Sequence, residues 1–225
     1  MVTVPAADAR QVADVYRHTQ ARITQLLTGS DAGVWASPVP ACPGWSVRDV
    51  VSHLTAVAQD WADGRLTGAP TDEETAEHVR RFGGLGETEL LHAWSDATDR
   101  LHHRVGTTGR EPPLGDIACH EHDIRGAIGK PGARDAESVR WTADRLLTML
   151  RPPVPVRVAV EDREYHSDPE GRVEIVLHTT RFEALRWRTG RRSRSQLAAM
   201  DWSGDPARVL DHLCLFGPAR ADVVE

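Results

Sequence analysis

Apolar residues recur every three or four positions from residue 7 to residue 150 of the 225-residue chain. This period is typical of amphipathic helices that bury one face. Ser46 and Asp49 form a capping-box variant and mark the start of one of these helices. Together, the period and the caps predict helices over residues 7–28, 46–61, 71–83, 88–105, 114–128 and 136–150.

The pattern changes from helical to alternating after Pro152 and Pro153. Valines at every second position over residues 154–160 predict one strand, and a second alternating run over residues 173–177 predicts another, paired with the first as a hairpin. Two more helices are predicted over residues 180–188 and 205–216. The expected fold is mainly α with a small α+β part: a helical bundle over residues 1–151, then a small α/β domain over residues 152–225.

Composition narrows the classes of function. Hydrophobic residues make up 40% of the chain, which is enough for a buried core, and the net charge of −6 disfavours nucleic acid as a partner. No apolar run approaches the roughly 20 residues that span a bilayer, so no membrane association is expected. Three separate cysteines without a CxxC pair, and no secretory leader, favour a cytoplasmic protein.

His53 is the first candidate for chemistry. It lies three residues after Val50 and four before Val57, on the inward face of the predicted helix over residues 46–61. A lone inward histidine is more often a hydrogen-bonded core residue than a metal ligand, so its position alone leaves both interpretations open.

Asp116 and His120 are the second candidate. They are four residues apart, so both side chains leave the same face of a helix and can hold one divalent ion from successive turns. His122 lies about 200° around the helix from His120 and should face elsewhere. The alternative is an ordinary polar pair on a helix. With His53 from another helix, the pair would complete a two-histidine, one-carboxylate metal site.

Three segments resemble the mycothiol-dependent maleylpyruvate isomerase family, a branch of the DinB-like superfamily. They are CPGWSVRDVVSHL at residues 42–54, DIACHEHDIRGAIG at residues 116–129 and LRWRTGR at residues 185–191. The resemblance covers most of the chain and implies an up-down bundle with a divalent metal, zinc above all, followed by a small α/β domain. It transfers the metal ligands to His53, Asp116 and His120.

The resemblance also assigns residues around the expected metal. Asp116 departs from the family, which has glutamate there, and this puts maleylpyruvate as the substrate in question. Asp123 is expected either to support the histidine or to pack the helix, and Trp45 is expected to be structural. Arg191 matches a family arginine that binds substrate anions, and its alternative is a place on a solvated basic face. Arg186, Arg188, Arg192 and Arg194 are expected to be solvated.

Three functions are compatible with these residues. The resemblance implies an enzyme that activates a low-molecular-weight thiol, mycothiol, for S-transfer to a small electrophile or for its cis–trans isomerisation. A non-catalytic, metal-dependent small-molecule binding protein would carry the same site, and so would a metal-dependent hydrolase. The expected partners are the thiol and the electrophile, and the expected state is a monomer or a homodimer.

Overall fold

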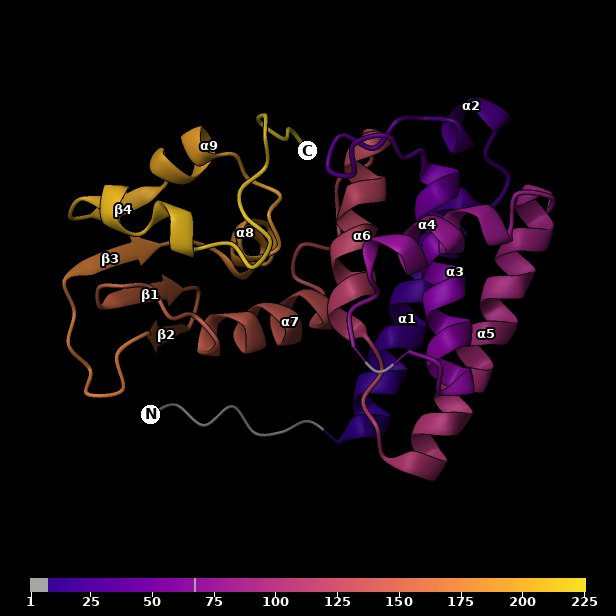
Figure 1. Cartoon of the computed structure of the whole chain (residues 1–225), viewed down its shortest axis with the longest axis horizontal. Helices are drawn as coiled ribbons and strands as arrows, with labels where there is room; N and C mark the ends of the chain where they lie inside the picture. Colours follow the sequence, from indigo (N-terminus) through magenta and orange to yellow (C-terminus); the bar gives the residue numbers. More distant parts are fainter. Residues whose placement is uncertain (1–7, 67) are drawn as a thin grey trace. The chain divides into compact units, whose positions relative to one another are not determined.

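The computed structural model describes residues 8–66 and 68–225. Contacts between residues divide the chain into two compact units: a bundle unit that ends at Pro131, and a C-terminal unit from Gly132 to Val224. Figure 1 shows the first as a group of helices and the second as a small sheet with helices. The mainly α fold with a small α+β part is confirmed.

The long helices of the bundle unit are α1, α3, α5 and α6, which Figure 1 shows side by side. In this unit α3 packs against α5 and α6, and α1 packs against the same two helices. Shorter helices α2 and α4 lie in the connections. The helices are α1 (Ala9–Leu27), α2 (Ala32–Trp35), α3 (Val47–Asp63), α4 (Asp72–Arg81), α5 (Glu87–Thr108) and α6 (Leu114–Ala127).

A tight turn leads into α3 and fixes where it starts. The Trp45 amide donates to the Cys42 carbonyl at 3.0 Å, with Pro43 and Gly44 between them. Gly44 has a φ of 86°, so the proline and glycine occupy the places that a type II turn favours. Ser46 then caps α3 in a capping box with Asp49, as predicted.

A buried carboxylate ties α6 to α1. Glu121 has a fully buried side chain, and Arg22 of α1 donates to it from Nε at 3.0 Å and from Nη2 at 2.6 Å. Arg125, one turn further along α6, donates to the same carboxylate at 3.1 Å. This two-pronged pairing fixes the rotation of α6, and with it the direction of the preceding residue, His120.

The C-terminal unit holds a four-stranded sheet in the order β2-β1-β3-β4. The predicted hairpin is wrong: β1 pairs with β3 in parallel, and with β2 in antiparallel fashion. The strand β2 was missed because Tyr165 is its one buried residue, which leaves no alternating apolar run. The strands are β1 (Val156–Val160), β2 (Arg163–His166), β3 (Ile175–His178) and β4 (Asp201–Ser203).

The helices of this unit also correct the sequence-based interpretation. The helix predicted over residues 205–216 is replaced by two short 3-10 turns, η1 (Pro206–Arg208) and η2 (Leu210–His212), whereas α9 (Arg194–Ala198) was not predicted. Helix α7 (Glu137–Thr148) packs against α8 (Arg181–Arg188). It therefore lies in the C-terminal unit, although the expected boundary at residues 151 and 152 placed it with the bundle.

Three arginines of the basic run are buried, which overturns the expectation that they are solvated. Arg186, Arg188 and Arg192 are 0%, 2% and 7% exposed. Arg192 donates to both carboxylate oxygens of Glu183 at 2.8 Å, and Arg188 donates from Nε to the Leu146 carbonyl at 3.1 Å. The guanidinium groups of Arg188 and Arg192 thus serve as internal donors of the C-terminal unit.

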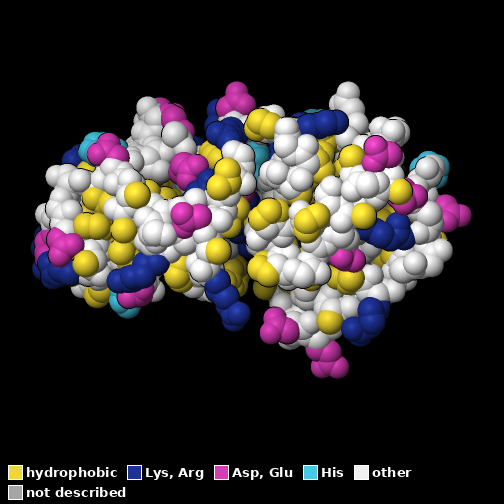
Figure 2. All heavy atoms as spheres, turned by 90° about the horizontal axis from the view of Figure 1, so that it is seen from above, with side chains coloured by type: hydrophobic (Ala, Val, Ile, Leu, Met, Phe, Trp, Pro, Cys, Tyr) yellow, Lys and Arg dark blue, Asp and Glu magenta, His cyan; other side chains and the backbone are white. Residues whose placement is uncertain are grey.

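The outer surface carries both signs of charge. Figure 2 shows Lys and Arg side chains interspersed with Asp and Glu on the face it presents, without one continuous basic field. Among the helices that the structure describes, none is both long enough and apolar enough to cross a membrane.

Candidate metal centre

The structure brings the three predicted ligands together. His53 comes from α3, and Asp116 and His120 come from successive turns of α6. Each offers one ligand atom, and the three atoms lie within 4.8 Å of one another. Asp116 Oδ1 lies 3.5 Å from His53 Nε2 and 3.5 Å from His120 Nε2. His122 is buried on α6 and is not one of these three atoms.

The triad is buried on its histidine side and open on its carboxylate side. The side chains of His53 and His120 are 4% and 9% exposed, whereas that of Asp116 is 27% exposed. The carboxylate is therefore the most exposed of the three side chains.

Asp123 holds the ring of His120. Its carboxylate is fully buried, and Oδ2 lies 2.9 Å from His120 Nδ1. An ionised carboxylate only accepts hydrogen bonds, so the ring proton sits on Nδ1 and the lone pair of Nε2 points to Asp116. Of the two roles expected for Asp123, this contact matches support of the histidine.

Cys42 and Trp45, from the turn before α3, lie beside the triad. The Cys42 thiol donates to Asp123 Oδ2 at 3.4 Å. The Trp45 ring stacks on the His120 ring at a centroid distance of 6.3 Å and an angle of 20°, and lies 5.3 Å from the His53 ring. The Pro-Gly-Trp turn thus places an indole over both imidazoles and restricts how they rotate.

Cys42, His120 and Asp123 are a second group whose ligand atoms lie within 4.8 Å of one another. In this group His120 would have to offer Nδ1. That nitrogen carries the proton donated to Asp123, so it has no lone pair for a metal. We therefore interpret the second group as support for His120.

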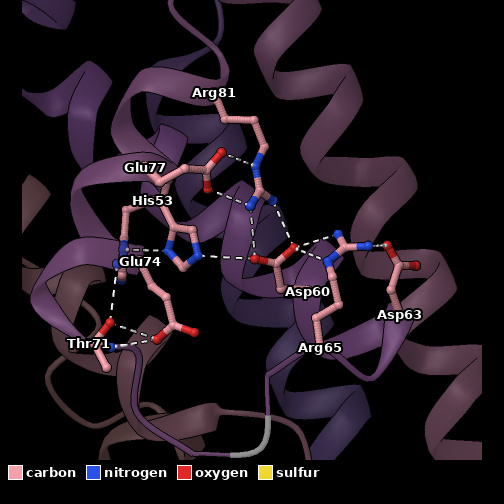
Figure 3. Close-up of polar contacts among 9 residues, drawn as sticks. His53, Asp60, Asp63, Arg65, Thr71, Glu74, Glu77 and Arg81 are labelled. Atoms are coloured by element: carbon pink, nitrogen blue, oxygen red, sulfur yellow. Dashed lines mark hydrogen bonds and ion pairs between the residues drawn. The ribbon is translucent and has the colours of Figure 1, made fainter.

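Behind His53 lies a polar cluster that no sequence pattern indicates. His78 of α4 is 1% exposed; its Nδ1 lies 3.4 Å from His53 Nδ1, and its Nε2 lies 3.1 Å from Asp60 Oδ2. Figure 3 shows Arg81 and Arg65 converging on Asp60 from the other side. Helix α4 has no apolar period that would have indicated a buried histidine.

The charges around Asp60 fix which groups are ionised. Burial alone would raise the pKa of the Asp60 carboxyl, but hydrogen bonds from Arg81 and Arg65 lower it to about 2. Burial, followed by the nearby His53, lowers the pKa of His78. At neutral pH, Asp60 is therefore an anion, and burial disfavours the charged form of His78.

Arg191, the predicted anion-binding residue, lies in the C-terminal unit just after α8. Its side chain is partly exposed, and Nη1 donates to the Thr189 carbonyl at 2.7 Å. Its role toward a substrate stays a prediction.

The bundle unit also matches a known family. Residues 16–118 match the mycothiol maleylpyruvate isomerase N-terminal domain. The matched stretch includes His53 and Asp116 and ends just before His120. It confirms the resemblance that the sequence motifs indicate, and it relates the chain to a family of enzymes. No curated protein sequence matches this chain.

Two solved structures share the fold. A crystal structure of the mycothiol-dependent maleylpyruvate isomerase has a TM-score of 0.54 and 13% identity, and covers 85% of this chain and 92% of its own. The structure of a histidine-to-alanine mutant of the mycothiol-dependent maleylpyruvate isomerase gives a TM-score of 0.53, 13% identity and coverage of 84% and 92%. At this identity the likeness concerns the fold.

Proposed function

We propose that this chain is a metal-dependent enzyme that activates a low-molecular-weight thiol, with a divalent ion, zinc, held by His53, Asp116 and His120. The observation that carries the proposal is the convergence of the three ligand atoms within 4.8 Å. Two imidazole nitrogens and one carboxylate oxygen are a donor set that zinc and related ions prefer. Without a cation, these three acceptors would face one another.

The aspartate at position 116 fits this set. Its Oδ1 is 3.5 Å from both imidazole nitrogens, so the shorter side chain still reaches the point where the two rings converge. Three protein ligands also leave at least one position open, which distinguishes a catalytic metal site from a closed structural one.

The bound ion would supply a positive charge that favours a thiolate over a thiol. The protein's own residues would do the rest. His53 and His120 set the direction of the open position, Trp45 covers the ring side, and Asp116 marks the side open to solvent. Mycothiol is the proposed thiol because the family that the bundle matches carries it in its description.

The proposed reaction has one addition step, after which the adduct can give either of two products. The thiolate sulfur adds to an electrophilic carbon of the substrate, a C–S bond forms, and the electron pair of the carbon–carbon double bond moves toward the substrate's carbonyl. Rotation about the resulting single bond, followed by loss of the thiolate, gives cis–trans isomerisation. Protonation with the C–S bond retained gives the S-transfer product instead.

A thiol-dependence assay tests the proposal against its alternatives. The zinc-loaded protein is incubated with maleylpyruvate, or with a small electrophile that accepts thiols, with and without mycothiol. We expect the electrophile to be converted only when mycothiol is present. Conversion without thiol would favour the hydrolase, and binding without any conversion would favour the non-catalytic binding protein.

Arg191 is proposed to hold a carboxylate of the substrate or the thiol, because a guanidinium binds carboxylates in a two-pronged fashion. Arg191→Ala should then lower turnover without releasing metal. Arg194→Ala is the matched control, because Arg194 is exposed and pairs with Asp211. Equal turnover of Arg191→Ala and wild type would remove Arg191 from the site.

A further inference from the structure

We propose that His78 and Asp60 are positioning residues that hold His53 in the tautomer with a bare Nε2, through contacts from Asp60 to His78 and from His78 to His53. The consequence for metal binding rests on the proposed function. The tautomer itself is a property of the metal-free chain and can be measured without metal.

The direction of the protons follows from the contacts. Asp60 is an anion and only accepts hydrogen bonds, so His78 carries its proton on Nε2, 3.1 Å from Asp60 Oδ2. With its Nε2 proton directed at Asp60 and its ring 1% exposed, His78 turns Nδ1 as an acceptor toward His53. His53 Nδ1, at 3.4 Å, must supply the proton of this contact. The lone pair of His53 Nε2 is consequently directed toward Asp116.

Without His78, another arrangement would compete. His53 could carry its proton on Nε2 and donate it to Asp116 Oδ1, which lies at 3.5 Å. That contact would satisfy both side chains in the metal-free chain and would cover the lone pair that a metal needs. The contact with His78 opposes this arrangement because it requires the proton on the other ring nitrogen.

The construction of α4 supports this role. Within this helix His78 is the one buried residue, so the helix contributes little apolar packing of its own. Thr71 and Glu74 cap its start. At its end Arg81 donates to Asp60 from Nη1 at 2.8 Å and from Nη2 at 3.0 Å.

Glu77 braces the same Arg81 guanidinium (Figure 3). Both ends of a short polar helix are therefore fixed around one histidine. A helix that served only to cover the bundle would bury apolar side chains instead.

The test reads the tautomer of His53 directly. Metal-free protein labelled with 15N at histidine is examined by long-range proton–nitrogen NMR, which distinguishes a protonated ring nitrogen from a bare one. We expect His53 to be protonated at Nδ1 in the wild type. His78→Phe should move the proton to Nε2, whereas His78→Asn should retain the wild-type tautomer, because its amide oxygen replaces the accepting Nδ1.

Zinc affinity, measured by competition with a chelator, gives the second readout. His78→Phe should weaken binding by about 10–100-fold, and His78→Asn should stay close to wild type. His92→Phe is the matched control, since His92 is exposed on α5. A wild-type His53 protonated at Nε2, or an unchanged tautomer in folded His78→Phe, would overturn the proposal. If His78→Phe does not fold, the wild-type spectrum alone decides.

The outcomes also separate this proposal from the proposed function. Protonation of His53 at Nδ1 in a chain that binds no zinc would support the positioning role and contradict the metal site.

Discussion

Two groups of charged side chains, one in each unit, are arranged in opposite ways. In the C-terminal unit, Arg181 donates from Nε to Asp144 Oδ1 at 2.5 Å and from Nη1 to Glu161 at 3.0 Å and to Asp162 at 2.6 Å. Each charge of this group meets the opposite charge. In the bundle unit, Asp116 meets two imidazole nitrogens that point lone pairs at it.

The difference distinguishes a structural network from a binding site. A buried guanidinium surrounded by carboxylates has its charge balanced within the chain, so it needs no ligand. Acceptors that converge on one another lack a donor or a cation between them. Burying them costs free energy until a cation binds. The buried arginines of the C-terminal unit therefore do not by themselves indicate a binding site. His53, Asp116 and His120 do indicate one, because they direct three acceptors at one another.

The largest effect on stability is expected at Arg181. Its side chain is 7% exposed and that of Asp144 is 11% exposed. Arg181→Met should therefore lower the free energy of unfolding by about 3 kcal/mol, because the buried Asp144 carboxylate then keeps only Arg163, at 3.6 Å, as a charged partner. Urea denaturation measures this loss, and zinc binding should be unchanged.

The matched control is Arg172→Met. Arg172 pairs with Asp168 and is 70% exposed, so the loss should be about 0–1 kcal/mol. Equal losses for the two variants would contradict the view that Arg181 completes a buried network.

Asp116→Asn should change the free energy of unfolding of the metal-free chain in the opposite direction, by raising it. In the metal-free chain its amide would donate to one of the imidazole nitrogens, which replaces a contact between two acceptors by a hydrogen bond. We expect the free energy of unfolding to rise by about 0.5–1.5 kcal/mol, while zinc affinity falls. A loss of stability in the metal-free variant would show that the triad is already complete without a cation.

The last effect is confined to acid pH. The pKa of Asp60 is about 2 in the folded chain, below the unfolded value of about 3.9. Its contribution to stability is therefore fully present above about pH 4 and is lost as the pH falls toward 2. The difference in unfolding free energy between wild type and Asp60→Asn should narrow over that range. A constant difference between the two unfolding free energies from pH 4 to pH 2 would contradict the lowered pKa of Asp60.

The sequence predicted the bundle helices and the shared face of Asp116 and His120 for related physical reasons, whereas the assignment of His53 as their partner rested on the family resemblance. A helix that buries one face repeats its apolar residues every three or four positions, and the same geometry puts Asp116 and His120 on one face. A capping box marked the start of α3, which carries His53. Local rules therefore sufficed wherever one helix determines the arrangement.

Long-range arrangements were harder to predict. β2 follows β1 in the chain and pairs with it in antiparallel fashion, and β3 then pairs with β1 in parallel. The sequence of β2 has no alternating apolar pattern that would predict a strand there. His78 is buried by contacts with two residues of α3, and nothing in its own helix indicates this. The buried arginines were interpreted as solvated because their partners, such as Glu183 for Arg192, come from folded geometry rather than from a repeating pattern.

Metal content measures the central claim most directly. Wild type, His53→Ala, His120→Ala and the exposed control His92→Ala are loaded with zinc, freed of loose metal by gel filtration and analysed by mass spectrometry for zinc per chain. We expect about one zinc ion per chain in wild type and in His92→Ala, and almost none in the other two variants. A folded His120→Ala that retains stoichiometric zinc would contradict the proposed metal site.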